Sequence, residues 1–317
     1  MNLSEIIYAF FGAMTLLGLF IDLGLLSKKN KIISFKIALI QTLLWVSLAL
    51  LFMLYLWYEE DKNHALQFLS AYVMEWSLSV DNIFVFIIIF SAFKIDELHH
   101  GRALLIGILI AIILRVLFIT VGLSLINQFH WIIYIFGVFL LYTGFKLFFS
   151  NNDEEFQPQE TKVYKWIKKI FPLTNHDGAG KYAVYENGKK RYTTLFVVVV
   201  LLAFIDLVFA LDSIPAVMGI SRDKLIVYTS NIFAVLGLRS LFFLLRGAVS
   251  KFDYLQQGIS IVLVFIGIKM LLENWINKIM DKDVQTVFSL IIILSCIMGS
   301  IVYSIFYQKK GLPKDIK

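Results

Sequence analysis

Two segments of the 317-residue chain carry the same acidic pattern inside long apolar runs. Glu75 is followed six positions later by Asp81, and Asp206 is followed six positions later by Asp212. In both segments a small polar residue and an isoleucine come next. An ionisable side chain at the centre of a membrane span costs roughly 2.5 to 3.5 kcal/mol to insert, so acids placed twice by one pattern indicate a functional site. The pattern predicts a buried cation site.

The residues around the acids narrow the class of ion. The candidate metal ligands are the four acids and the polar residue that follows each second acid, namely Glu75, Asp81, Asn82, Asp206, Asp212 and Ser213. Carboxylate, amide and hydroxyl oxygens form a hard ligand set, which suits Mn²⁺, Ca²⁺ or Mg²⁺ better than copper or zinc. We expect the ion to be transported, with no tightly bound cofactor.

The composition excludes a soluble protein. The chain is 59% hydrophobic and only 16% charged, whereas soluble domains are about a quarter charged. Its net charge is +6, but the basic residues form short clusters between apolar runs. Such clusters are typical of loops that set membrane topology, so no nucleic-acid partner is expected. Apolar runs of about 20 residues predict nine membrane spans, and hence an all-α polytopic transmembrane bundle in contact with membrane lipid.

Loop charges predict the orientation of these spans. Lysines gather in the first loop and in the C-terminal tail, whereas the second loop is acidic. The positive-inside rule then places the N-terminus outside and the C-terminus in the cytoplasm, in a cell (inner) membrane. Residues 151–192 become a cytoplasmic loop, in which Asn187 and Gly188 predict the turn of a short β-hairpin. Asp22, beside the lysine-rich first loop, is predicted to be an interfacial charge.

Further matches extend the duplicated acids into two repeats of three spans. Arg115 corresponds to Arg239, and residues 142–146 correspond to 265–269, with a glycine at the centre of each. Three spans per repeat reverse the orientation of the second copy, as in many secondary transporters. The acids are then expected at similar depths on antiparallel helices, and the glycines are expected to permit close helix approach.

The repeats divide the chain into five parts. We expect two N-terminal helices, repeat A, the cytoplasmic loop, repeat B, and a C-terminal helix with a basic tail, at residues 1–60, 61–150, 151–192, 193–277 and 278–317.

The six-residue spacing constrains the geometry of each half. Residues six apart on an α-helix lie about 120° apart around its axis. Either the polar arc of each helix is broad, or the helix is interrupted between its acids so that backbone carbonyls also face the site. Pro215 favours an interruption in the second copy, because proline cannot donate a hydrogen bond to the carbonyl of Leu211.

Buried charges are expected to balance. Four carboxylates and the guanidinium groups of Arg115 and Arg239 leave a formal charge of −2, which one divalent cation or bound protons would neutralise. The arginines are expected to be supporting counter-ions that hold acids in place. Asn231 either contacts the ion or bridges helices.

Several longer segments resemble a known family. Residues 75–85, 129–137, 209–216 and 229–240 resemble, in that order, motifs of the TerC family of integral membrane proteins. This resemblance implies a multi-pass membrane protein named for tellurium resistance, in a family with members linked to export of divalent metal, mainly manganese. It also implies that the metal site lies on the four acids. Many members carry a glutamate where this chain has Ala203, three positions before Asp206. If that glutamate is a ligand in them, this site has one carboxylate fewer.

Three functions are compared on this basis. The first is export of a divalent cation, with manganese preferred and protons as a candidate counter-ion. No G-x-x-x-x-G-K-[ST] motif is present, so direct ATP coupling is not expected. The second is a membrane assembly or scaffold protein that acts through its cytoplasmic loop. The third is an intramembrane aspartyl protease, in which two facing aspartates share a proton. Because the acids come in pairs with matching arginines, we do not expect an enzyme.

Overall fold

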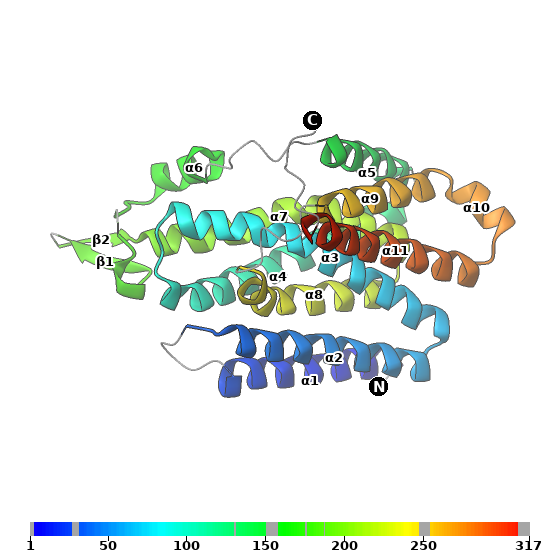
Figure 1. Cartoon of the computed structure of the whole chain (residues 1–317), viewed down its shortest axis with the longest axis horizontal. Coiled ribbons are helices and arrows are strands. Elements are labelled where there is room, and N and C mark those ends of the chain that lie inside the picture. The colour runs from blue at the N-terminus through cyan, green and yellow to red at the C-terminus, as the bar shows by residue number, and fades with distance from the viewer. Residues whose placement is uncertain are drawn as a thin grey trace.

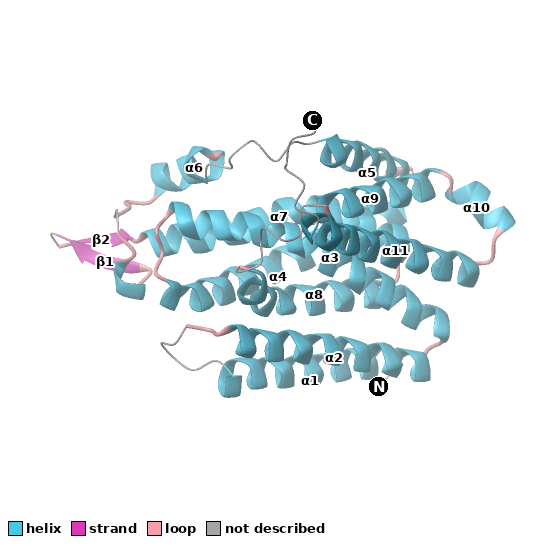
Figure 2. Cartoon of the chain, in the orientation of Figure 1, coloured by secondary structure: helices cyan, strands magenta, loops and turns pink. Residues whose placement is uncertain are grey.

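The structure is a computed structural model that describes residues 3–26, 32–129, 131–149, 158–174, 176–186, 188–246 and 254–309. Within these ranges a few side chains, those of Asp81 and Asp212 among them, lie outside the described part. Long helices dominate and lie side by side along one direction (Figures 1 and 2). The chain is therefore an all-α polytopic bundle, as predicted.

The long helices and the two strands have the following bounds. In chain order they are α1 (Leu3–Leu19), which continues as a π-helix (Phe20–Leu26), α2 (Phe35–Glu59), α3 (Lys62–Ala92), α4 (Glu97–Gln128), α5 (Ile132–Phe149), α6 (Lys162–Ile170), β1 (Ala183–Glu186), β2 (Lys189–Tyr192), α7 (Thr194–Ile220), α8 (Lys224–Leu245), α9 (Leu255–Leu271), α10 (Glu273–Ile279) and α11 (Lys282–Lys309). Two short 3₁₀ helices, Pro158–Glu160 and Gly178–Gly180, lie before and after α6.

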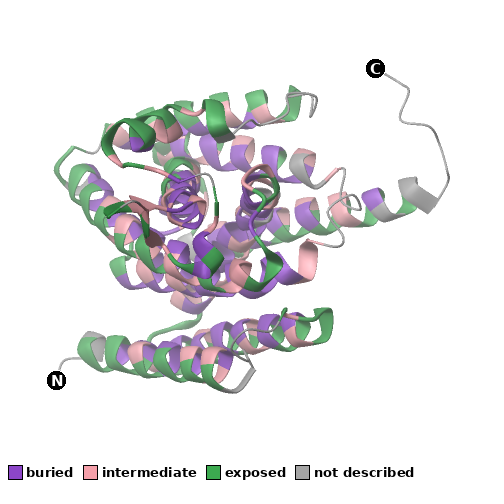
Figure 3. Ribbon diagram, turned by 90° about the vertical axis from the view of Figure 1, so that its left-hand side faces the viewer, coloured by how far each residue is buried: buried purple, intermediate pink, exposed green. Residues whose placement is uncertain are grey.

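The bundle has two distinct ends. Strands β1 and β2 lie at one end, with α6 close by, and α10 lies at the other (Figure 1). We call these the hairpin end and the α10 end. The loop that joins α2 to α3, which carries the acidic residues Glu60 and Asp61, lies at the α10 end. Helices α1 and α2 form a pair on one side of the remaining helices (Figures 1 and 3).

Seven helices of the described part are long and apolar enough to cross a membrane. Helices α9 and α10 form a bent pair that meets at an angle of 79°. This pair adds an eighth crossing if it counts as one span. Helix α3, which carries Glu75 and Asp81, is 31 residues long but is not among the seven. The count of nine spans stays a prediction.

Helix α8 forms the centre of the bundle. Nearly every residue from Leu225 to Phe243 is buried, and α8 packs against α2, α3 and α4. The aromatic ring of Phe233 on α8 lies 5.6 Å from that of Phe52 on α2 and 6.2 Å from that of Phe68 on α3. In Figure 3 the buried residues accordingly lie on the helix faces that point into the bundle, and the exposed residues lie on the outer faces.

The pairing of the helices is the same when the two predicted repeats are exchanged. Helix α3 packs against α8, and α4 packs against α7. When α3 is exchanged with α7, α4 with α8 and α5 with α9, the pair α3 and α8 becomes the pair α7 and α4. This exchange also leaves the packing of α5 against α9 unchanged. Two copies related by a two-fold axis would make these contacts, although the inverted repeat itself stays a prediction.

Glycines allow α5 and α9 to pack closely. A Cβ atom built on Gly267 would lie 2.9 Å from the carbonyl oxygen of Gly137, and one built on Gly144 would lie 3.0 Å from that of Ser260. The first distance is shorter than Cβ atoms show in proteins, and the second is tighter than nearly all such contacts. The expected role of Gly144 and Gly267 in close helix approach is therefore confirmed.

The acids lie on unbroken helices. Helix α3 is continuous from Lys62 to Ala92, and α7 is continuous from Thr194 to Ile220 with Pro215 inside it. The predicted interruption at Pro215 is therefore wrong. Helix α7 packs against α3, α4, α5 and α9. Packing on several sides keeps the backbone helical on both sides of Pro215. The carbonyl of Leu211 still cannot receive a hydrogen bond from position 215. Of the two predicted arrangements, the broad polar arc remains.

The predicted hairpin is present. Strands β1 and β2 are antiparallel, and Glu186 pairs with Lys189 across a two-residue turn. Gly188 has a φ angle of +73°, which favours glycine. Asn187 lies outside the described residues.

We expect Gly267→Ala to lower the free energy of unfolding by about 1 to 3 kcal/mol, because the added methyl group pushes α9 away from the backbone of Gly137. Gly299→Ala in α11 is the matched control, since a Cβ atom there meets nothing within 4 Å. Thermal unfolding of the purified protein in detergent measures both. Equal effects of the two substitutions would contradict the packing described for α5 and α9.

Candidate functional site

An arginine on α4 binds two acids at the centre of the bundle. Arg115 donates from Nε to Asp206 Oδ2 at 2.6 Å and from Nη2 to Asp206 Oδ1 at 3.0 Å, a bidentate contact. Its Nη1 donates to Glu75 Oε2 at 2.9 Å. The three side chains are 0 to 2% exposed. The first acid of each sequence motif is therefore paired with the same guanidinium group.

Asn231 on α8 completes this network. Its Oδ1 accepts a hydrogen bond from Arg115 Nη1 at 3.2 Å, and its Nδ2 donates to Glu75 Oε1 at 2.6 Å. All four carboxylate oxygens of Glu75 and Asp206 thus have a partner. The network joins α3, α4, α7 and α8, so the structure shows Asn231 bridging helices.

The charges of this network do not cancel. Two carboxylates and one guanidinium group give a formal charge of −1 among side chains that are at most 2% exposed. Removing one partner of such a buried pair leaves an uncompensated charge, which is far more costly than losing a surface ion pair. A cation that approached Glu75 or Asp206 would compete with Arg115 for their oxygens.

The second acid of each motif lies away from this network. Gln67 of α3 and Met218 of α7 line one cavity at the α10 end, whereas Phe93 and Thr194 line another at the hairpin end, so α3 and α7 are antiparallel. Six residues of helix span about 9 Å. Position 81 therefore lies about 9 Å from Arg115 toward the hairpin end, and position 212 lies about 9 Å toward the α10 end.

The expected similar depth of all four acids is thus wrong for the second acids. Glu75 and Asp206 lie at the same level because both contact Arg115. Two antiparallel helices that meet at their first acids carry their second acids in opposite directions. The side chains of Asp81 and Asp212 lie outside the described residues, whereas their backbone positions lie within the continuous helices α3 and α7.

Two buried hydroxyl groups near these positions have no partner. Ser79 Oγ and Ser213 Oγ form no hydrogen bond within the described part of the chain, and both residues are at most 2% exposed. Ser79 is two residues from Asp81, and Ser213 follows Asp212 directly. Asn82 is also buried. An unsatisfied buried polar group calls for an explanation, and a hydroxyl group without a partner is free to contact a bound ion.

Arg239 belongs to a different network. Its Nη2 donates to Asp22 Oδ1 at 2.8 Å, and Trp45 Nε1 donates to Asp22 Oδ2 at 3.3 Å. Asp22 is only 2% exposed. The π-helix that follows α1 packs against Trp45 of α2 and places the Asp22 carboxylate inside the bundle, where it is paired rather than solvated. Its position at the membrane interface stays a prediction. Arg239 holds an acid in place, as expected, but not one of the motif acids.

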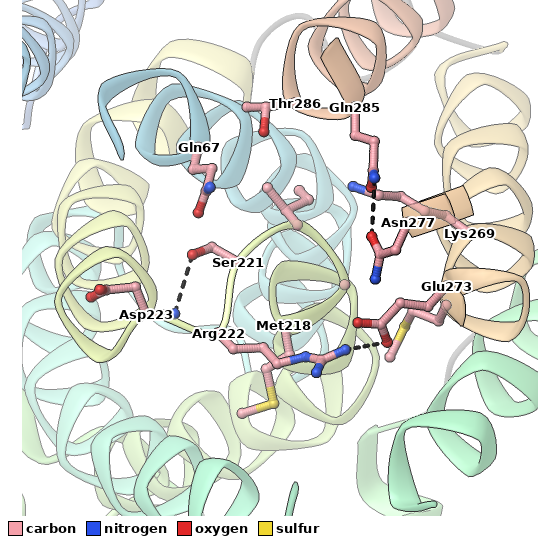
Figure 4. Close-up of a pocket in the computed structure, with 13 residues that line it drawn as sticks. Gln67, Met218, Ser221, Arg222, Asp223, Lys269, Glu273, Asn277, Gln285 and Thr286 are labelled. Carbon is pink, nitrogen blue, oxygen red and sulfur yellow. Dashed lines mark hydrogen bonds and ion pairs between the residues drawn. The ribbon is translucent and has the colours of Figure 1, made fainter. Parts of the chain in front are cut away.

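A cavity of about 380 Å³ lies at the α10 end (Figure 4). Arg222, from the loop after α7, forms an ion pair with Glu273 of α10 at its edge. Met218, which also lines the cavity, is six residues beyond Asp212 on α7. On α7 the lining of this cavity therefore begins about 9 Å beyond position 212. No cluster of three or more His, Cys, Asp or Glu side chains suited to a metal occurs among the described residues.

The chain has close relatives over nearly its whole length. The profile described as "Integral membrane protein TerC family" matches residues 60–312. An uncharacterized membrane protein of Myxococcus xanthus is 44% identical over 98% of this chain and 95% of its own length. One from Rickettsia felis is 40% identical over 90% of this chain and 93% of its own. Alx of Escherichia coli K12, which bears the provisional name of a membrane-bound redox modulator, is 36% identical over 97% of this chain and 98% of its own. No solved structure matches.

We expect Arg115→Met to lower the free energy of unfolding by about 3 to 5 kcal/mol, because it leaves Glu75 and Asp206 buried without a counter-ion. The matched control is Arg246→Met, which breaks a partly exposed ion pair with Glu97 and should cost at most about 1 kcal/mol. Thermal or denaturant unfolding in detergent compares the two. A loss of stability in Arg115→Met no larger than that in Arg246→Met would contradict the conclusion that Arg115 stabilises the bundle through Glu75 and Asp206.

Proposed function

Because the chain belongs to the TerC family of integral membrane proteins, we propose that it exports a divalent metal cation, with manganese preferred, along the acids of α3 and α7. The observation that carries the proposal is the buried network of Glu75, Arg115, Asp206 and Asn231. Ionisable groups inside a membrane protein mark ion or proton pathways.

In this proposal the acids form two half-sites rather than one site. Asp81 and Asn82 belong to the half-site on the hairpin side of Arg115, and Ser79, one turn beyond Glu75 on α3, lies between Glu75 and that half-site. Asp212, with Ser213 and the carbonyl of Leu211, belongs to the half-site on the α10 side. All of these are hard oxygen ligands, and they suit Mn²⁺, Mg²⁺ or Ca²⁺.

Arg115 acts in this proposal as a tethered cation between the half-sites. When no ion is near, its guanidinium group neutralises part of the charge of Glu75 and Asp206. An ion that passes must exchange with Arg115 at those oxygens. The bidentate geometry favours the guanidinium group unless the ion carries a higher charge, so a divalent ion competes better than a monovalent one.

The proposed direction follows from the two ends of the bundle. The hairpin end carries the lysine-rich loop 151–192, which the positive-inside rule assigns to the cytoplasm. The cavity lined by Met218, Arg222 and Glu273 lies at the other end and would form the exit. Carboxylates that bind a cation also bind protons, so proton exchange is the proposed coupling.

Other functions receive less support. An aspartyl protease needs two aspartates that share a proton, whereas positions 81 and 212 lie about 18 Å apart along the bundle. An intramolecular dithiol redox activity needs two cysteines, and Cys296 is the only one in this sequence. No observation in the described segment 158–192 points to a scaffold partner.

We expect Asp81→Asn and Asp212→Asn each to reduce manganese flux into inverted vesicles at least about ten-fold, because each removes the charged ligand of one half-site. Glu97→Gln is the matched control, since Glu97 lies at the start of α4 in a half-exposed ion pair. Its flux should stay at the wild-type level. Wild-type flux in both aspartate variants would refute the proposal.

We expect a saturating concentration of the transported ion to raise the thermal midpoint of the purified protein. An ion at 100 times its dissociation constant stabilises the folded state by about 2.7 kcal/mol. Mn²⁺ should give the largest shift among Mn²⁺, Ca²⁺, Mg²⁺ and Zn²⁺, and the Ser79→Ala/Ser213→Ala variant should reduce it. Equal shifts with all four ions, unchanged by the serine substitutions, would argue against a selective site.

A further inference from the structure

Helix α6 has one basic face and one apolar edge. Four of its nine residues are lysines, none is acidic, and all four lysines are exposed. Trp166 and Ile170, one turn apart, are 59% and 50% exposed. At 100° per residue these two side chains lie between the buried face and the lysines. An amphipathic helix with an exposed tryptophan beside lysines is typical of a helix at a membrane surface.

The buried face of α6 fixes the helix to the bundle. Ile167 is fully buried, and the ring of Tyr164 lies 5.5 Å from that of Phe93, which follows α3. Thr161 caps the helix by accepting a hydrogen bond from the amide of Tyr164 at 3.2 Å. The exposed tryptophan and lysines are therefore held on a rigid element and not on a free segment.

The position of α6 sets its depth in the membrane. Helix α6 packs against α7 (Figure 1), and Tyr164 and Lys168 line a cavity together with Thr194 and Val197, in the first turn of α7. Residues 194–211 form one of the candidate spans. Helix α6 thus lies beside the beginning of a span, where phospholipid headgroups are found.

The cavity under α6 has the chemistry of a headgroup site. Its volume is about 710 Å³, and its lining combines aromatic walls, such as Phe93 and Phe171, with Lys94 and Lys168. Asp177 also lines the cavity, but its carboxylate is held by His99 Nδ1 at 3.1 Å. Within the described residues neither Lys94 nor Lys168 has an ion-pair partner, so both ammonium groups are available to an anion.

We propose that α6 and this cavity bind an anionic phospholipid. Lys94 and Lys168 contact the headgroup phosphate, Lys165 and Lys169 face neighbouring anionic headgroups, and Trp166 and Ile170 lie against the acyl chains. Basic side chains near an anionic membrane surface each add to the attraction, and aromatic side chains anchor at the interface. The proposal concerns a lipid contact and does not depend on which ion the protein transports.

The test uses the full-length protein in an uncharged detergent, titrated with phosphatidylglycerol, phosphatidylcholine or inorganic phosphate while the thermal midpoint is recorded. Phosphatidylglycerol should raise the midpoint of the wild type more than phosphatidylcholine does. In the variant Lys165→Gln/Lys168→Gln/Lys169→Gln the half-saturating concentration of phosphatidylglycerol should rise on the order of ten-fold. The variant Lys94→Gln/Lys168→Gln tests the cavity alone and should also weaken binding.

The matched control removes three exposed lysines from the hairpin region, as Lys181→Gln/Lys189→Gln/Lys190→Gln. It should respond to phosphatidylglycerol as the wild type does. Equal effects of both lipids on the wild type, or equal losses in the α6 variant and the hairpin control, would overturn the proposal. A shift with inorganic phosphate alone would show a free-anion site and would overturn the assignment to lipid.

Discussion

The bundle is organised around the neutralisation of buried acids by one guanidinium group. In a medium of low dielectric constant an uncompensated carboxylate is costly, so Glu75 and Asp206 require Arg115 as soon as the helices pack. These contacts fix α3, α4 and α7 at one level, and Asn231 adds the central helix α8. Because the donors of a guanidinium group are fixed in a plane, this network constrains rotation as well as depth.

The sequence predicted features that depend on local pattern. The cost of buried charge identified Glu75 and Asp206 as a matched pair with an arginine partner, and the two-residue turn at Gly188 identified the hairpin. The glycines of α5 and α9 were identified because only a missing side chain permits backbone contact. The signal for the hairpin lies in two neighbouring residues, whereas the acids and the glycines were identified because their local patterns recur in the second predicted repeat.

Features that depend on distant partners could not be predicted. The ion pair of Asp22 was not predicted because Arg239, its partner, lies 217 positions away in the chain. Pro215 was read as a helix break because the packing of α7 on four other helices is not visible in a local pattern. The divergence of positions 81 and 212 follows only from where α3 and α7 meet, which no spacing within either helix determines.

The antiparallel arrangement of α3 and α7 also shows on which side of Arg115 the residue Ala203 lies, where many members of the family are expected to carry a glutamate. Ala203 lies three residues before Asp206 on α7, about 4.5 Å toward the hairpin end. It is buried, on the same side of Arg115 as position 81. A glutamate there would add its charge to the hairpin side alone. The substitution therefore bears on one half of the proposed pathway and leaves the α10 side unchanged.

The long sequence separation of the buried ion pairs has a consequence for how the protein is made. Asp22 enters the membrane with the first helix, but Arg239 is synthesised 217 residues later. At about 5 to 20 residues per second, the ribosome needs roughly 10 to 40 s to cover that distance. During that interval the carboxylate has the indole N–H of Trp45 as a hydrogen-bond donor, but it lacks the guanidinium group that neutralises it. The first two helices therefore depend on water, on protonation or on the insertion machinery until α8 arrives.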